Sequence, residues 1–277
     1  MKNLSFRIQS KTAFLMLAGL TLFFFGGAVF SSLGSIQQAQ QDQIEKPKIF
    51  QEAYPLISES DLYCSFFILE DELPQIKIIA SERQEEKILL SDSDIFFIDK
   101  GKNDGLEVGQ VFLILEIGPQ IKSPVTKENY GQLAFKRGRA SIVRLEETNG
   151  TAKIEKTCGQ IMVGQFLAPF EEKEGLLGKD LGFEVIPEEE RPSSGNLIYL
   201  QDGYNMIGPG HWALIDLGRE DGVQIGQQMT VFKRAKEETT RQAIGNLIVI
   251  DTQGMTSTVK ILSCSEAIEL GDEVQIK

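Results

Sequence analysis

Two stretches of sequence decide the fold of this chain: IDKGKNDGLEVGQ at residues 98–110 and IDLGREDGVQIGQ at residues 215–227. Both follow the pattern I-D-x-G-x-x-D-G-x-x-x-G-Q, and matching positions lie 117 residues apart. The residues that define the pattern are Gly101, Gly105, Gly109 and Asp104 in the first copy and Gly218, Gly222, Gly226 and Asp221 in the second. Glycine adopts positive φ angles, and an aspartate before a glycine bonds back to its own backbone. The pattern therefore predicts paired tight turns between two strands.

The similarity between the copies extends in both directions from these turns. Upstream, FFILEDELP ends at Pro74 and FEVIPEEERP ends at Pro192. Downstream, TAKIEKTCGQIMVGQFL at residues 151–167 is similar to STVKILSCSEAIELGDEV at residues 257–274. Because chance does not preserve order and spacing over about a hundred residues, the sequence predicts an internal duplication.

Each copy has the pattern of β structure. Short runs rich in Val, Ile, Leu and Phe, such as QVFLILEIG and NLIYLQDG, are bounded by Gly, Asp or Asn. A small domain of many strands must hide its sheet edges, and closure into a barrel does so. We therefore expect a mainly β protein with two tandem homologous small β-barrels or compact sandwiches. Four residues after the turns are expected to plug the barrel ends: Leu106, Val108, Val223 and Ile225.

The N-terminus carries an uncharged apolar run at residues 12–30, preceded by Lys2, Arg7 and Lys11. A helix of that length spans about 28 Å, close to the hydrocarbon core of a bilayer. The basic flank predicts that the rest of the chain lies outside the cytoplasm. An uncleaved anchor would make a single-pass inner-membrane protein with its C-terminal part in the periplasm. A cleaved signal peptide would instead release a secreted or periplasmic protein.

These features together predict five segments along the chain. They are a signal anchor or signal peptide at residues 1–31, a polar linker at 32–54, a first β-domain at 55–170, a linker at 171–180 and a second β-domain at 181–277.

The turn G-x-x-D-G-x-x-x-G-Q and the closing stretch SEAIELGDEV at residues 265–274 resemble a small β-domain of bacterial envelope proteins. That domain is found at the C-terminus of flagellar assembly protein T, and similar domains occur beside LysM peptidoglycan-binding modules. The resemblance covers both copies and is clearest in the second. It implies a bacterial periplasmic protein with a structural or binding role.

Charge and motifs argue against several function classes. The formal net charge is −12, which opposes direct binding of nucleic acid. Two acids around a glycine turn resemble part of a calcium loop, but Glu107 of the first copy is replaced by Gln224 in the second. A calcium loop usually offers six or more oxygen ligands, so the sequence predicts no metal and no cofactor.

The candidates for chemistry are few. The single histidine, His211, precedes the single tryptophan, Trp212, and Asp94 holds the histidine's place in the first copy. No G-x-S-x-G motif accompanies them, and we expect no catalytic residues. Trp212 is expected to pack in the core, with stacking on a carbohydrate as the alternative. His211 and Trp212 are therefore weak binding candidates.

The three cysteines are Cys64, Cys158 and Cys264. Buried free thiols are expected by default. Cys64 with Cys158, both in the first copy, is the pairing to test, since thiols outside the cytoplasm commonly pair.

The sequence thus predicts a non-catalytic scaffold or adaptor of the cell envelope that is not an enzyme. Its expected partner is another envelope protein or peptidoglycan, with the cytoplasmic membrane contacted through the N-terminal segment. The alternatives are a peptidoglycan- or carbohydrate-binding protein and a periplasmic hydrolase. Paired carboxylates for glycoside cleavage would need a deep cleft, which disfavours the hydrolase.

Overall fold

The computed structural model describes residues 54–70, 72–82, 88–183, 193–234 and 241–277. The segment from residue 51 to the C-terminus forms one compact unit. The apolar run at residues 12–30 lies outside the described residues. Within the described ranges, no helix has both the length and the apolar character needed to cross a bilayer.

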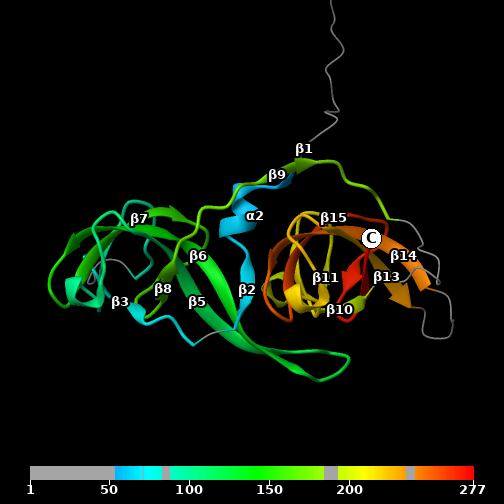
Figure 1. Cartoon of the computed structure of the whole chain (residues 1–277), viewed down its shortest axis with the longest axis horizontal. Helices are drawn as coiled ribbons and strands as arrows, with labels where there is room; N and C mark the ends of the chain where they lie inside the picture. Colours follow the sequence, from blue (N-terminus) through cyan, green and yellow to red (C-terminus); the bar gives the residue numbers. More distant parts are fainter. Residues whose placement is uncertain (1–53, 71, 83–87, 184–192, 235–240) are drawn as a thin grey trace, which may run out of the picture. The chain divides into compact units, whose positions relative to one another are not determined.

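The first copy folds into a barrel of six antiparallel strands in the order β6-β5-β8-β3-β4-β7, closed by pairing of β6 with β7 (Figure 1). Its strands are β3 (Ile76–Ser81), β4 (Ile95–Ile98), β5 (Val111–Lys122), β6 (Asn129–Leu145), β7 (Gly150–Thr157) and β8 (Phe166–Pro169). A further strand, β2 (Phe66–Leu69), pairs with the N-terminal part of the long β6.

The second copy forms a closed barrel of six strands in the order β10-β12-β15-β14-β13-β17. Its strands are β10 (Ser194–Leu200), β12 (Trp212–Ile215), β13 (Gln228–Arg234), β14 (Arg241–Thr252), β15 (Ser257–Cys264) and β17 (Glu273–Ile276). The short pair β11 (Met206–Ile207) and β16 (Ile268–Glu269) lies outside the barrel order. The single bridge between Leu90 and Ile161 takes the place of this pair in the first copy.

Matching hydrogen bonds show that the two barrels are built alike. The N–H of Gly109 donates to the carbonyl of Ile142 at 2.8 Å. The N–H of Gly226 donates to the carbonyl of Val249, also at 2.8 Å. Strand order, turns and hydrogen bonds therefore agree with the predicted pair of tandem barrels.

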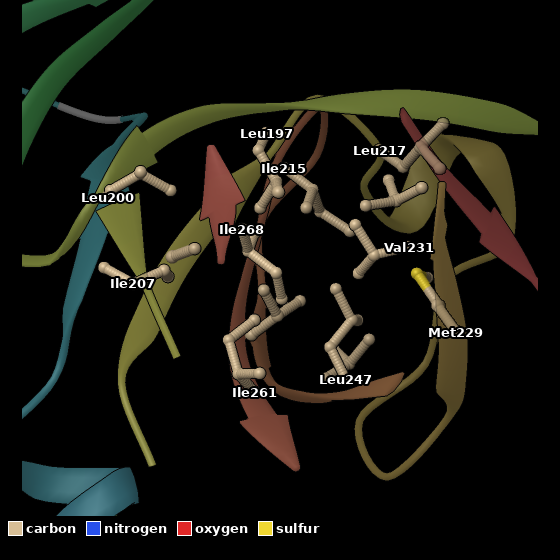
Figure 2. Packing of buried hydrophobic residues seen from close by; sticks show 14 of the residues in the cluster. Leu197, Leu200, Ile207, Ile215, Leu217, Met229, Val231, Leu247, Ile261 and Ile268 are labelled. Carbon is tan, nitrogen blue, oxygen red and sulfur yellow. The ribbon is translucent and has the colours of Figure 1, made fainter. Parts of the chain in front are cut away.

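Each barrel encloses its own core of inward-facing aliphatic side chains. Figure 2 shows the core of the second barrel, where Ile215, Val231, Leu247 and Ile261 point toward one another from different strands. These side chains are fully buried, as are Phe96, Ile114 and Ile142 of the first barrel. The alternation of inward and outward residues along each strand fills both interiors with apolar groups.

The turn pattern adopts the predicted conformation with one difference. Gly105 and Gly109 have φ angles of 80° and 92°, and Gly222 and Gly226 have the same conformation in the second copy. The first glycine has no positive φ: Gly101 is extended, and a Cβ there would lie 2.5 Å from the carbonyl oxygen of Glu146. Glycine is needed at that position because a neighbouring turn approaches its backbone closely.

The aspartates of the turns act as predicted, whereas two of the expected plugs do not. Each carboxylate of Asp104 and Asp221 accepts the N–H of the first glycine of its turn, within the short 3-10 helices η1 (Lys102–Asp104) and η4 (Arg219–Asp221). Val223 is buried and Leu106 packs against the first core. Val108 and Ile225 are 63% and 48% exposed, so their prediction as plugs was wrong. The tight turn that ends at the third glycine leaves these two side chains on the surface.

A short segment that precedes the first barrel in the chain contacts both barrels. It consists of β1 (Tyr54–Ile57), α2 (Glu59–Tyr63) and β2. β1 pairs with β9 (Leu176–Gly178), which lies in the stretch expected to be a linker. The acidic stretch that was matched to FFILEDELP falls largely at residues 184–192, outside the described residues.

Candidate functional site

Three charged side chains, Asp61, Lys136 and Asp251, are buried among the described residues, and they lie where α2 meets the two barrels. The side chain of Ser58 caps α2 by accepting the N–H of Asp61. In turn, the carboxylate of Asp61 accepts the N–H of Ser58 at 2.8 Å. The same carboxylate accepts Nε1 of Trp212 at 2.9 Å and Nζ of Lys260 at 2.7 Å. Asp61 therefore joins the N-terminal segment to strands β12 and β15 of the second barrel.

The environment of Asp61 holds it in the charged form. Burial raises the pKa of its carboxyl, but hydrogen bonds from Lys260, Ser58 and Trp212 outweigh burial and lower the pKa below 3.8. Asp61 is 4% exposed, so the buried carboxylate depends on these donors for its stability.

A second ionic contact joins the barrels directly. Nζ of Lys136 on β6 lies 2.8 Å from Oδ2 of Asp251 on β14, and both side chains are buried. Lys136 also donates to the carbonyl of Leu62 in α2 at 2.8 Å. Lys173, from the stretch between the barrels, donates to the other oxygen of Asp251 at 3.1 Å.

Burial and charge shift the pKa values of this group in opposite directions. Burial lowers the pKa of Lys136, against the attraction of Asp251. Burial raises the pKa of Asp251, but the charges of Lys136 and Lys173 outweigh it, so the pKa lies below 3.8. The group lines a small pocket of about 160 Å³ with Tyr63, Phe67 and Glu171. No His, Cys or Ser is among the described residues that line this pocket.

Apolar packing completes the junction. Outward-facing residues of the second barrel, Ile248 and Ile250, are fully buried against Leu56 and Leu62 of the N-terminal segment. A neighbouring cluster brings Phe66 and Ile68 of β2 against Leu214 of β12. The hydroxyl of Thr258 donates to the carbonyl of Phe66 at 2.6 Å. Apolar contacts and buried ion pairs thus share one interface.

A disulfide links Cys64, which follows α2, to Cys158, which follows β7. The default expectation of free thiols was wrong for these two cysteines, and the bond is the pairing that the sequence had singled out. It attaches the N-terminal segment covalently to the first barrel. Cys264 is free and half-buried, and burial raises the pKa of its thiol.

The two residues that the sequence offered as binding candidates lie in different surroundings. Trp212 is half-buried, and its ring packs on Phe66 with centroids 6.4 Å apart. Its indole is thus part of the junction. His211 is half-buried, with Nδ1 3.0 Å from the carbonyl oxygen of Gly208. Its ring lies 6.3 Å from that of Tyr204, which is exposed.

The turn residues of the duplicated pattern are not brought together into a site. The N–H of Gly101 and the side chain of Lys100 lower the pKa of Asp104. In the described part of the chain, no three His, Cys, Asp or Glu side chains are grouped as metal ligands would be.

Sequence reasoning missed the four charged residues of the junction: Asp61, Lys136, Asp251 and Lys260. Asp61 had one local signal, the capping-box spacing from Ser58. The other three lie on strands among apolar residues, where a charge is typical of an exposed face. Their burial follows from packing between elements far apart in the sequence.

The chain matches no protein-family model and no curated protein.

Proposed function

We propose that this chain is a non-catalytic scaffold or adaptor of a bacterial cell envelope. In this proposal the N-terminal apolar run holds it at the cytoplasmic membrane, and the two joined barrels bind another envelope component in the periplasm. The resemblance to the domain of flagellar assembly protein T supports the location.

The observation that carries the proposal is that the buried ionic groups hold separate parts of the protein together. Asp61 with Lys260, and Lys136 with Asp251, connect one part of the protein to another. Residues with strongly shifted pKa values often mark reaction centres, but ion pairs that hold structure shift pKa values as well. Here the groups with shifted pKa values, Asp61, Lys136 and Asp251, are already bonded to other residues of the junction, which favours a scaffold over an enzyme.

A carbohydrate-binding function is the second candidate, and one observation favours it. Tyr204 is 53% exposed and lies beside the ring of His211. An exposed aromatic ring next to a polar ring can stack on a sugar and bond to its hydroxyls. Trp212 is less suited to this role because its indole is bonded to Asp61.

The two candidates are separated by sedimentation with purified peptidoglycan sacculi. The full chain is solubilised in mild detergent, and wild type is compared with Tyr204→Ala and with a matched control, Met206→Ala, which is similarly exposed. The adaptor proposal expects that the chain stays in the supernatant. Pelleting of wild type and of Met206→Ala, lost in Tyr204→Ala, would replace the adaptor with a glycan-binding protein.

The adaptor proposal is tested directly by photo-crosslinking in native envelope membranes. A photoreactive residue is placed at Val108 or Ile225, two exposed turn positions. The expected result is a discrete crosslinked product that contains an envelope protein. Absence of protein adducts from both positions and from a third exposed position, Val143, would contradict the proposal.

A further inference from the structure

The surface of the second barrel that receives the N-terminal segment has a counterpart on the first barrel. On the second barrel this surface consists of outward-facing residues of neighbouring strands β10, β12, β15 and β14. They are Ile198, Trp212, Leu214, Ile248, Ile250, Thr258 and Lys260. We call it the docking face.

Strand register identifies the counterpart residue by residue. Leu214 pairs with Thr258 in the second barrel, and Phe97 pairs with Thr151 in the first. Ile248 pairs with Lys260, and Ser141 pairs with Lys153. The counterpart face thus has the same threonine and the same lysine in the same places. Its remaining members are Ile79, Ile95 and Val143.

The two faces differ in what covers them. Ile198 and Ile250 of the docking face are buried, whereas Ile79 and Val143, in the equivalent positions, are 47% and 43% exposed. Phe97 and Ile95 are half-buried, and Lys153 is exposed. No described residue forms an ion pair with Lys153, whereas Lys260 is paired with Asp61 at 2.7 Å. The counterpart face therefore presents apolar side chains around an unpaired lysine.

We propose that the counterpart face of the first barrel binds a segment of a partner protein that carries aliphatic side chains beside one carboxylate. The segment would bind as Leu56, Ile57 and Asp61 bind on the docking face. The charged group of the partner would pair with Lys153. This inference rests on the proposed adaptor function and names the surface and the chemistry of its partner.

Charge at the edge of the face argues against a second copy of this chain as the occupant. The docking face has Asp251 at its edge, and this residue receives Lys136 of the first barrel. The equivalent residue of the counterpart face is Arg144, which is exposed. A second copy docked in the same way would bring Lys136 against Arg144, and two like charges repel. The face therefore favours a partner other than a second copy, with a carboxylate that can pair with Lys153.

The experiment measures binding of a labelled peptide to the full chain in detergent by fluorescence anisotropy. The probe has the chain's own sequence from Tyr54 to Tyr63, which holds the aliphatic pair and the carboxylate. We expect saturable binding that weakens about tenfold for the chain variants Val143→Glu and Lys153→Glu and for a peptide with Asp61→Asn. Val163→Glu is the matched control, since Val163 is 44% exposed on the same barrel, and it should bind as wild type does.

Three outcomes would overturn the inference. The first is equal binding by wild type, Val143→Glu and Lys153→Glu. The second is concentration-dependent self-association of the chain that Val143→Glu abolishes, which would assign the face to a second copy. The third is peptide binding only after deletion of residues 32–53, which would assign it to the chain's own N-terminal stretch. Unchanged thermal unfolding of the variants shows that they are folded.

The peptide result and the crosslinking result can be told apart. Specific peptide binding without an envelope adduct would sustain the face and contradict the envelope adaptor. Suppose instead that a turn position gives an envelope adduct and that Val143→Glu binds the peptide as wild type does. This result would support the adaptor function and contradict the binding role of the counterpart face.

Discussion

Lys136 and Asp251 form a buried ion pair between the two barrels, with Nζ 2.8 Å from Oδ2. Each residue also has a second partner at the junction: Lys136 donates to the carbonyl of Leu62, and Asp251 accepts from Lys173. A buried pair of this kind adds little stability compared with apolar residues, but removal of one partner leaves an uncompensated charge. We therefore expect the pair to favour one arrangement of the barrels over others.

The two partners of this pair should respond unequally to substitution. Asp251→Leu leaves Lys136 buried without a carboxylate, and we expect a loss of about 3–5 kcal/mol in the free energy of unfolding. Lys136→Met should cost less, because Asp251 retains Lys173 at 3.1 Å. The double variant should be more stable than Asp251→Leu alone. Urea unfolding followed by the fluorescence of the single tryptophan measures all three. A double variant less stable than Asp251→Leu would contradict this account.

Asp61 should make the stability of the junction depend on acid pH. Its pKa in the folded protein lies below its ordinary value of 3.8, so the unfolded chain binds more protons as the pH falls. The stabilisation is complete above pH 3.8, and it is lost as the pH drops through the pKa of Asp61 in the folded protein. Asp61→Asn should therefore unfold more easily than wild type at pH 7, by about 1–3 kcal/mol. The difference should shrink below about pH 3.

This comparison has a built-in control. Burial raises the pKa values of Asp216 and Asp272, but both groups are present in wild type and in Asp61→Asn, so the difference isolates Asp61. The readout is urea unfolding at several pH values, followed by Trp212 fluorescence. A difference that stays constant from pH 7 to about pH 2 would show that Asp61 does not act through its charge.

The disulfide between Cys64 and Cys158 should stabilise the attachment of α2 to the first barrel. The two cysteines are 94 residues apart, so the bond restricts a long loop of the unfolded chain. Reduction should lower the free energy of unfolding by about 2–4 kcal/mol. Thiol titration of the denatured chain should find one thiol before reduction and all three after it. Cys264→Ser is the control and should leave the effect of reduction unchanged.

The glycines of the duplicated turn should differ in their sensitivity to alanine. Gly105 has a φ of 80° and open space around it, so Gly105→Ala should cost only the left-handed conformation, about 1 kcal/mol. Gly101→Ala should cost more, about 3 kcal/mol, because its Cβ would meet the carbonyl oxygen of Glu146 at 2.5 Å. The same order is expected for Gly222 and Gly218. Thermal unfolding of the four variants measures this order, and a reversed order would rule out the explanation.

The sequence predicted those parts of the fold that depend on local chemistry. Gly105, Gly222 and their aspartates indicated turns because positive φ angles and short side-chain bonds to the backbone involve residues close together in the chain. Repetition of those turns indicated the second barrel. The first glycine was predicted for the wrong reason, because Gly101 is required by contact with Glu146, a residue of another turn.

The sequence alone determined that two similar small barrels form, since alternating apolar strands and glycine turns are local signals. Only the tertiary structure decided which outward faces are covered. Lys136 and Asp251 are separated by 115 residues, and Asp61 and Lys260 by 199. Lys153 and Lys260 occupy equivalent positions in similar strands, yet one is exposed and the other is paired with Asp61. The difference arises because a single N-terminal segment packs against one barrel face and leaves its counterpart uncovered by the described part of the chain.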